Sequence, residues 1–126
     1  MKVLLVEDED VLREAVAGIL EVKAYDYLAV SDGQYAWEAL PTYQPDLIIT
    51  DIKMPRMTGL ELLEKVQNSE FATIPAIVMS AYALKEYMTQ AETLNVFAYL
   101  TKPFSLIEMV NTIESIFDKS LCPSVK

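Results

Sequence analysis

The sequence predicts an α/β fold in which five parallel strands alternate with five helices, (βα)5, and the helices cover both faces of a doubly wound sheet. Five short apolar runs are each followed by a stretch with apolar residues at helical spacing. Crossovers of this length imply parallel strands with right-handed connections. Four of the five runs end in polar side chains, at the edge of an open parallel sheet where ligands bind.

Composition narrows the class of protein. The 126 residues are enough for one domain with a core, and a hydrophobic content of 52% argues against disorder. The net charge of −9 argues against direct nucleic-acid binding, which depends on basic groups. The absence of histidine excludes histidine-dependent catalysis and histidine metal sites on this chain. Oxygen ligands would therefore hold any metal, which favours Mg²⁺, Ca²⁺ or Mn²⁺.

Cellular location is inferred from what the sequence lacks. No apolar stretch approaches the roughly 20 residues needed to span a bilayer, so no membrane association is expected. Met1 directly precedes the first apolar run, without a leader of the secretory type. The single Cys122 cannot form an internal disulfide. We therefore expect a cytoplasmic protein.

The first half of the chain contains three strand–helix units. Residues 2–6 form a strand, and Asp10 is expected to cap a helix over about 11–22. A second strand is expected at 26–30, and the helix after Ser31-Asp32-Gly33 should end at Leu40, before Pro41. The third strand, 46–50, lies between prolines and stops at Asp51. Thr58 and Glu61 form a capping box for a helix to about residue 68.

The second half contains the remaining two units. A strand at 76–79 precedes a helix over about 84–94, after which Asn95 suits a left-handed cap. A strand at 96–100 follows. Ser105 and Glu108 form a second capping box, which opens a helix to about 118. Residues 1–119 should therefore form the domain, and residues 120–126 a short polar tail.

Reactive groups follow four of the expected strands. Glu7 and Asp8 follow the first, Asp51 the third, Ser80 the fourth, and Lys102 comes shortly after the fifth. Parallel strands bring these groups to one pocket, where three carboxylates repel each other. A divalent cation such as Mg²⁺ would relieve the repulsion and hold a phosphoryl donor against a carboxylate nucleophile. Mg²⁺ and Lys102 would offset most of the negative charge after transfer to Asp51.

These residues resemble the receiver domain of two-component response regulators, the chemotaxis-receiver fold. The resemblance covers Met1 to about Lys119 and depends on several motifs at matching spacing. They are Glu7-Asp8, Asp32-Gly33, the run from Pro45 through Asp51 to Met54-Pro55, Thr58-Gly59, Ser80-Ala81 and Tyr99 through Lys102-Pro103 to Phe104. The resemblance implies a flavodoxin-like sheet with the strand order 2-1-3-4-5.

The resemblance also implies roles for individual residues. Asp51 would accept a phosphoryl group from a sensor histidine kinase or a histidine phosphotransfer protein. The metal would be Mg²⁺, bound by Asp51, by Asp8, by Glu7 through water and by the main-chain carbonyl of Lys53. Ser80 and Lys102 would contact the phosphoryl group. Tyr99 would be the switch aromatic, Lys102-Pro103 a cis peptide, and the face formed by 84–94, 96–100 and 105–118 the output surface.

Some interpretations remain open. Ser80 could bond only to the chain, and Tyr99 could be an ordinary core or edge aromatic. Tyr82, two residues past Ser80, is expected to shield the phosphoryl group from water, although it could instead contact a partner.

A phosphate-independent pseudo-receiver is the alternative function. A phosphohydrolase of the haloacid-dehalogenase type is disfavoured because Lys53 stands where those enzymes have a second acid. Self-phosphotransfer and autodephosphorylation are thus expected, without turnover of an outside substrate. The sequence leaves open which kinase and which output partner protein are involved. It also leaves open whether phosphorylation produces a homodimer, and whether the chain is a stand-alone protein or a piece of a longer regulator.

Overall fold

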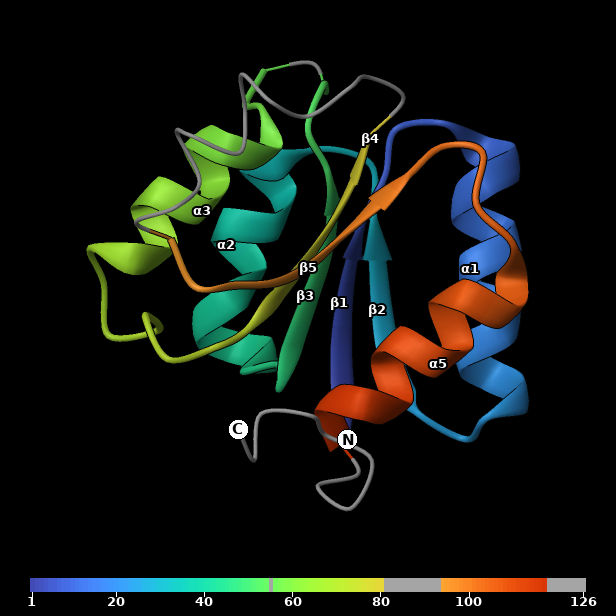
Figure 1. Ribbon diagram of the computed structural model, residues 1–126. Helices are drawn as coiled ribbons and strands as arrows, with labels where there is room; N and C mark the ends of the chain where they lie inside the picture. The colour runs from blue at the N-terminus through green and yellow to red at the C-terminus, as the bar shows by residue number, and fades with distance from the viewer. Residues whose placement is uncertain (55, 81–93, 118–126) are drawn as a thin grey trace.

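The computed structural model describes residues 1–54, 56–80 and 94–117. Its centre is a five-stranded sheet with the order β2-β1-β3-β4-β5, in which every neighbouring pair is parallel (Figure 1). The strands are β1 (Lys2–Val6), β2 (Asp26–Val30), β3 (Leu47–Asp51), β4 (Ala76–Ser80) and β5 (Val96–Thr101). This confirms the predicted fold class, and β3 and β4 each run one residue further than expected, to Asp51 and Ser80.

Helices lie on both faces of the sheet. The described helices are α1 (Asp10–Val22), α2 (Gly33–Tyr43), α3 (Gly59–Gln67) and α5 (Leu106–Phe117). Figure 1 shows α2 and α3 on one face and α1 and α5 on the other. Within the described ranges, no helix has the length and apolar character needed to cross a membrane.

Alternate residues of each central strand contribute to two separate cores. Leu4, Val6 and Ile48 face α2 and α3, where Leu40 and Leu63 complete the cluster. The intervening residues of the same strands pack on the opposite side. They are Val3, Leu5, Leu47 and Ile49, which contact the cluster containing Val16 and Leu20 of α1 and Met109 and Ile113 of α5. Both faces of β1 and β3 are buried, as in a sheet covered by helices on each side.

The two capping boxes are present as predicted. Thr58 Oγ1 accepts from the Glu61 N–H at 3.1 Å, and Glu61 Oε1 accepts from the Thr58 N–H at 2.9 Å. Ser105 and Glu108 make the same reciprocal pair, with both distances 3.1 Å. Each box satisfies two backbone donors that the first turn of a helix leaves unpaired.

The predicted cap at Asp10 is wrong. The N-cap of α1 is Glu9, which makes no side-chain capping bond, and Asp10 already lies in the first turn. The Asp10 carboxylate instead pairs with the guanidinium of Arg13, three residues along the helix. A charged partner on the same helix face has thus replaced the backbone N–H groups as the donor to this carboxylate.

Two other predicted helix ends also differ. Pro41 lies inside α2, which continues to Tyr43 and closes with Gln44 in the left-handed conformation at φ 51°. A proline already has the φ of a helix, and in the last turn it removes only one hydrogen bond. Asn95 is not among the described non-glycine residues with positive φ, so the left-handed cap predicted there is wrong. Its carbonyl instead accepts from the Ala76 N–H at 3.1 Å.

Three predictions lie outside the described residues. These are the helix at 84–94, the shielding role of Tyr82 and the tail at 120–126.

Gly59 allows α3 to begin directly against the end of β3. A Cβ added at Gly59 would lie 2.0 Å from the main-chain oxygen of Asp51 and 3.0 Å from its carbonyl carbon. The Gly59 N–H donates to the carbonyl of Ile52 at 2.7 Å. The first turn of α3 therefore touches the backbone that carries Asp51, and only a residue without a Cβ fits.

Gly59→Ala is expected to destabilise the protein by about 3 kcal/mol, since the added methyl group must displace backbone rather than a flexible side chain. Urea denaturation measures the effect. Gly18→Ala is the matched control, because a Cβ there has nothing within 4 Å and α1 should gain up to about 1 kcal/mol. Equal stability of Gly59→Ala and the wild type would contradict the close approach.

Candidate functional site

The register of the sheet brings four strand ends to one edge. Val6 pairs with Thr50, which places Glu7 level with Asp51. Asp51 pairs with Met79, and Ser80 pairs with Thr101, which places Ser80 and then Lys102 at the same edge. This is the edge to which the strand arrows point in Figure 1.

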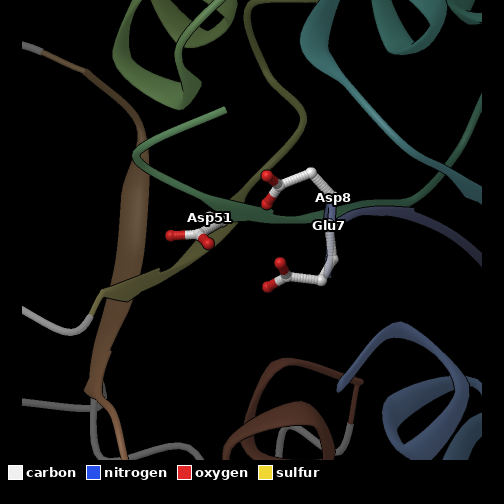
Figure 2. Close-up of side chains that lie close together, drawn as sticks. All are labelled: Glu7, Asp8 and Asp51. Atoms are coloured by element: carbon white, nitrogen blue, oxygen red, sulfur yellow. The ribbon is translucent and has the colours of Figure 1, made fainter. Parts of the chain in front are cut away.

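Three carboxylates gather at this edge. One carboxylate oxygen from each of Glu7, Asp8 and Asp51 lies within 4.8 Å of the others. Figure 2 shows the side chains of Glu7 and Asp8 leaving the end of β1 in opposite directions, with Asp51 beside them. Glu7 is 0% exposed and Asp51 is 8% exposed, whereas Asp8 is exposed to solvent. The cluster is therefore buried on one side and open on the other.

Lys102 joins two of these carboxylates. Its Nζ lies 2.8 Å from Asp51 Oδ2 and 3.1 Å from Glu7 Oε1, and its side chain is 20% exposed. The N–H of Lys102 also donates to the Ser80 carbonyl at 2.6 Å, which fixes the start of the connection after β5. The Lys102–Pro103 peptide is cis, as the resemblance implied.

Backbone groups orient the two buried carboxylates. Asp51 Oδ1 accepts from the Ile52 N–H at 2.7 Å, and Glu7 Oε2 accepts from the Glu9 N–H at 2.9 Å. The guanidinium of Arg13 donates to the Glu7 carbonyl at 2.8 Å. Each buried carboxylate thus has one oxygen bonded to the backbone and the other bonded to Lys102.

Burial changes the proton affinity of this cluster. Burial, the largest cause, and the nearby charge of Asp51 raise the pKa of Glu7 from 4.5 to about 7, against the opposing effects of the Glu9 N–H and of Lys102. For Lys102, burial lowers the pKa, but the hydrogen bonds and charges of Asp51 and Glu7 outweigh burial and raise it. Lys102 is therefore positively charged at neutral pH, and Glu7 is close to its titration midpoint.

The donor set suits a hard divalent cation. All three groups offer oxygen, the preferred ligand of Mg²⁺. With the three carboxylates ionised, the single ammonium of Lys102 leaves two negative charges without a counter-charge in the cluster. The exposed Asp8 gives an ion a route from solvent. A metal site at Glu7, Asp8 and Asp51 is consistent with this arrangement.

The structure brings together four of the predicted site residues, namely Glu7, Asp8, Asp51 and Lys102. Ser80 lies at the same edge and is buried. Lys53 is exposed on the connection after β3, and its role as a main-chain ligand stays a prediction.

Tyr99 is half-buried against the core beneath α2 and α3, and its switch role likewise stays a prediction. Pro103 lines a cavity of about 350 Å³ beside the site, together with Glu9, Leu12, Lys102 and Phe104.

No sequence pattern predicts the ion pair made by Arg56, on the connection after β3. Its Nε and one terminal nitrogen lie 2.9 Å and 3.2 Å from the two carboxylate oxygens of Asp32. The same guanidinium lies over the ring of Tyr35, 4.6 Å from its centroid. The sequence offers no local signal for a pair that is 24 residues apart.

Comparison with known proteins identifies the family. The profile of the response regulator receiver domain matches residues 3–114. The chain belongs to the receiver domain family. Receiver domains are the regulated modules of two-component response regulators, and the strand order found here is the one the resemblance implied.

Curated relatives of this receiver domain include longer regulators. The transcriptional regulatory protein PdtaR of Mycobacterium tuberculosis is 33% identical over 114 residues, which cover 90% of this chain and 55% of that protein. Response regulator RR06 of Streptococcus pneumoniae is 33% identical over 118 residues, which cover 92% of this chain and 52% of that protein. The chain thus spans about half the length of these relatives.

Two solved structures superpose closely on the fold of this receiver domain. The chemotaxis protein CheY4 of Vibrio cholerae has a TM-score of 0.85 at 27% identity, with 91% of this chain and 97% of that chain covered. The N-terminal domain of a Wolinella succinogenes protein has a TM-score of 0.87 at 31% identity, with 96% and 97% covered. Both likenesses cover nearly the whole receiver domain.

Proposed function

We propose that this receiver domain is a phosphorylation-activated switch in which Asp51 accepts a phosphoryl group in a Mg²⁺-dependent step. The observation that carries the proposal is the contact of one ammonium, that of Lys102, with both Asp51 and Glu7 at 2.8 Å and 3.1 Å, beside the exposed Asp8. This arrangement supplies a nucleophile, a fixed cation and an oxygen-ligand site at one edge of the sheet.

The chemical step is transfer between a nitrogen and an oxygen. A carboxylate oxygen of Asp51 attacks the phosphorus of a phosphohistidine on the partner. The new P–O bond forms as the P–N bond breaks, and the departing imidazole nitrogen keeps the electron pair and takes up a proton. A small acyl phosphate reacts in the same way, with its carboxylate as the leaving group.

Side chains of this domain orient and neutralise the reacting groups. The Ile52 N–H holds Asp51 Oδ1 at 2.7 Å, which restricts the rotation of the nucleophile. Lys102 lies within hydrogen-bond distance of Asp51, so its charge can stabilise the negative charge that accumulates on the phosphoryl oxygens. A bound Mg²⁺ would supply further electrostatic stabilisation, held by Glu7, Asp8, Asp51 and the carbonyl of Lys53.

The signal is proposed to pass from Asp51 to a protein partner. Ser80 would bond the phosphoryl group, and Tyr99 would change its packing when that bond forms. The output surface would be the face formed by residues 84–94, 96–100 and 105–118. Phosphorylation would shift the equilibrium between two conformations of this face only through interactions that differ between those conformations. Tyr82, outside the described residues, would limit the access of water to the phosphoryl group.

The partners proposed are a sensor histidine kinase or a histidine phosphotransfer protein as donor and a protein as output target, in the cytoplasm. A net charge of −9 supports an output through protein rather than direct binding to nucleic acid. The reactions proposed for this chain are its own phosphorylation and dephosphorylation, with residues 1–119 as the working unit. A phosphate-independent interaction module is the alternative, and no described contact favours it.

Removal of Mg²⁺ is expected to reduce phosphorylation of the wild-type protein by at least about tenfold. The protein is incubated with a small acyl phosphate, with MgCl₂ or with a chelator, and its intact mass is followed with time. One added phosphoryl group should accumulate in the presence of metal. The physical reason is the negative charge left in the carboxylate cluster, which repels an anionic donor until a cation is bound.

The same experiment separates the two functions. An adduct that forms equally fast with chelator would contradict the metal dependence. No adduct under any condition, together with measurable Mg²⁺ binding by calorimetry, would favour the phosphate-independent module.

A further inference from the structure

We propose that Arg56 is a positioning residue for the metal site. Its ion pair with Asp32 holds the described residues of the connection between β3 and α3, 52–54 and 56–58, so that the main chain at Lys53 can serve the metal site. The inference rests on the proposed function, because it concerns the Mg²⁺ affinity of that same site. We call the Arg56–Asp32 pair the Arg56 brace.

The backbone at Arg56 indicates that its position matters. Arg56 has φ 66°, in the left-handed region that residues with a side chain seldom adopt. Glycine would adopt this φ at no cost. The guanidinium, however, makes two hydrogen bonds to Asp32, at 2.9 Å and 3.2 Å, and stacks on Tyr35. The side-chain contacts offset an unfavourable backbone conformation, which is the pattern of a residue retained for its interactions.

The brace joins the connection to a rigid element. Asp32 is 5% exposed and is the N-cap of α2, where its Oδ1 accepts from the Tyr35 N–H at 2.9 Å. The neighbouring Gly33 lies against the same connection, since a Cβ there would be 2.7 Å from the Met57 carbonyl oxygen. Asp32 therefore cannot move without α2, and Arg56 is tied to a fixed point.

The tied segment is also joined directly to the nucleophile. It begins at Ile52, whose N–H bonds Asp51 Oδ1, and it ends where the Gly59 N–H bonds the Ile52 carbonyl at 2.7 Å. Met54 and Met57 are 8% and 6% exposed and anchor the segment in the core. Lys53 is exposed and lies between the buried residues Ile52 and Met54. Residues that hydrogen-bond to metal ligands without touching the metal change affinity by about 10–100-fold in other proteins.

The charge of Arg56 makes the test decisive. A positive charge near a cation site weakens binding through space, so Arg56→Gln would tighten Mg²⁺ binding if charge alone mattered. Asp32→Asn would weaken binding for the same reason. The brace predicts instead that both variants weaken Mg²⁺ binding, by about tenfold. Asparagine is as good an N-cap as aspartate, so Asp32→Asn removes the ion pair while keeping the cap of α2.

Isothermal titration of the full chain with MgCl₂ measures these affinities. Arg56→Gly is the third variant, because it relieves the left-handed backbone and should keep a melting temperature near that of the wild type while losing about tenfold in affinity. The double variant Arg56→Gln/Asp32→Asn should bind no more weakly than either single variant. Lys23→Gln is the control, since it breaks the 3.3 Å pair between Lys23, the C-cap of α1, and Glu114 of α5 and should leave the affinity unchanged.

The outcomes are distinct. If Arg56→Gln tightens Mg²⁺ binding while Asp32→Asn weakens it, the effect is one of charge, and the proposed role of the Arg56 brace is overturned. Unchanged affinity in Arg56→Gly and Asp32→Asn, with a wild type that binds Mg²⁺ and becomes phosphorylated, would overturn the brace alone. A wild-type protein that binds no Mg²⁺ would overturn both the brace and the proposed function.

Discussion

Asp51→Asn is expected to reduce phosphorylation from an acyl phosphate by at least about 100-fold. The amide keeps the shape of the carboxylate and can still accept the Ile52 N–H, which lies 2.7 Å from Oδ1. It lacks the negatively charged oxygen that attacks phosphorus. The fold should be retained, because Lys102 keeps its contact with Glu7 at 3.1 Å. Intact mass after incubation with Mg²⁺ and the donor measures the loss.

The matched control is Asp26→Asn, which makes the same chemical change at an exposed aspartate. Asp26 begins β2 and lies at the opposite edge of the sheet from Asp51. This variant should be phosphorylated like the wild type. An adduct of undiminished amount on Asp51→Asn would mean that another residue is the acceptor.

Glu7→Gln is expected to stabilise the metal-free protein by about 3 kcal/mol at pH 8. Burial raises the pKa of Glu7 from 4.5 to about 7, so the folded state holds this proton more tightly than the unfolded state. The contribution of the protonated Glu7 to the free energy of unfolding is fully present below pH 4.5. It is lost as the pH rises through about 7. Glutamine mimics the protonated acid at every pH. The rise in the pKa of Glu7 from 4.5 to about 7 corresponds to a free energy of about 3 kcal/mol.

Urea denaturation between pH 4 and pH 8 in the presence of a chelator measures the effect. The wild type should lose stability across this range relative to Glu7→Gln, and the two should agree near pH 4. Glu14→Gln removes one negative charge from an exposed position on α1 and controls for net charge. A Glu7→Gln variant that is less stable than the wild type at pH 8 would show that the contact with Lys102 outweighs the cost of burial.

Patterns that act over a few residues were sufficient to predict the architecture. Apolar runs and their polar ends located all five strands, and β1 and β2 have the predicted bounds. The capping boxes at Thr58 and Ser105 were predictable because both partners lie within one turn. The meeting of Glu7, Asp51 and Lys102 followed from the parallel sheet, because the carboxyl ends of its strands share one edge.

Features that depend on distant partners were not predictable. One local prediction also failed, because Asp10 was expected to cap α1 but pairs with Arg13, three residues along the same helix. Arg56 has a left-handed backbone, and its partner Asp32 is the N-cap of α2, 24 residues earlier in the sequence. The need for glycine at Gly59 comes from the close approach of the Asp51 carbonyl, which depends on how β3 and α3 meet.

The most direct test of the central claim is to locate the phosphoryl group. The wild-type protein is phosphorylated with an acyl phosphate and Mg²⁺ and then reduced with borohydride, which converts an acyl phosphate of aspartate to homoserine. Peptide mass spectrometry then identifies the altered position. We expect homoserine at position 51 and unmodified aspartate at position 8. Homoserine at any other position, or none at 51 in protein that carries the adduct, would contradict the central claim.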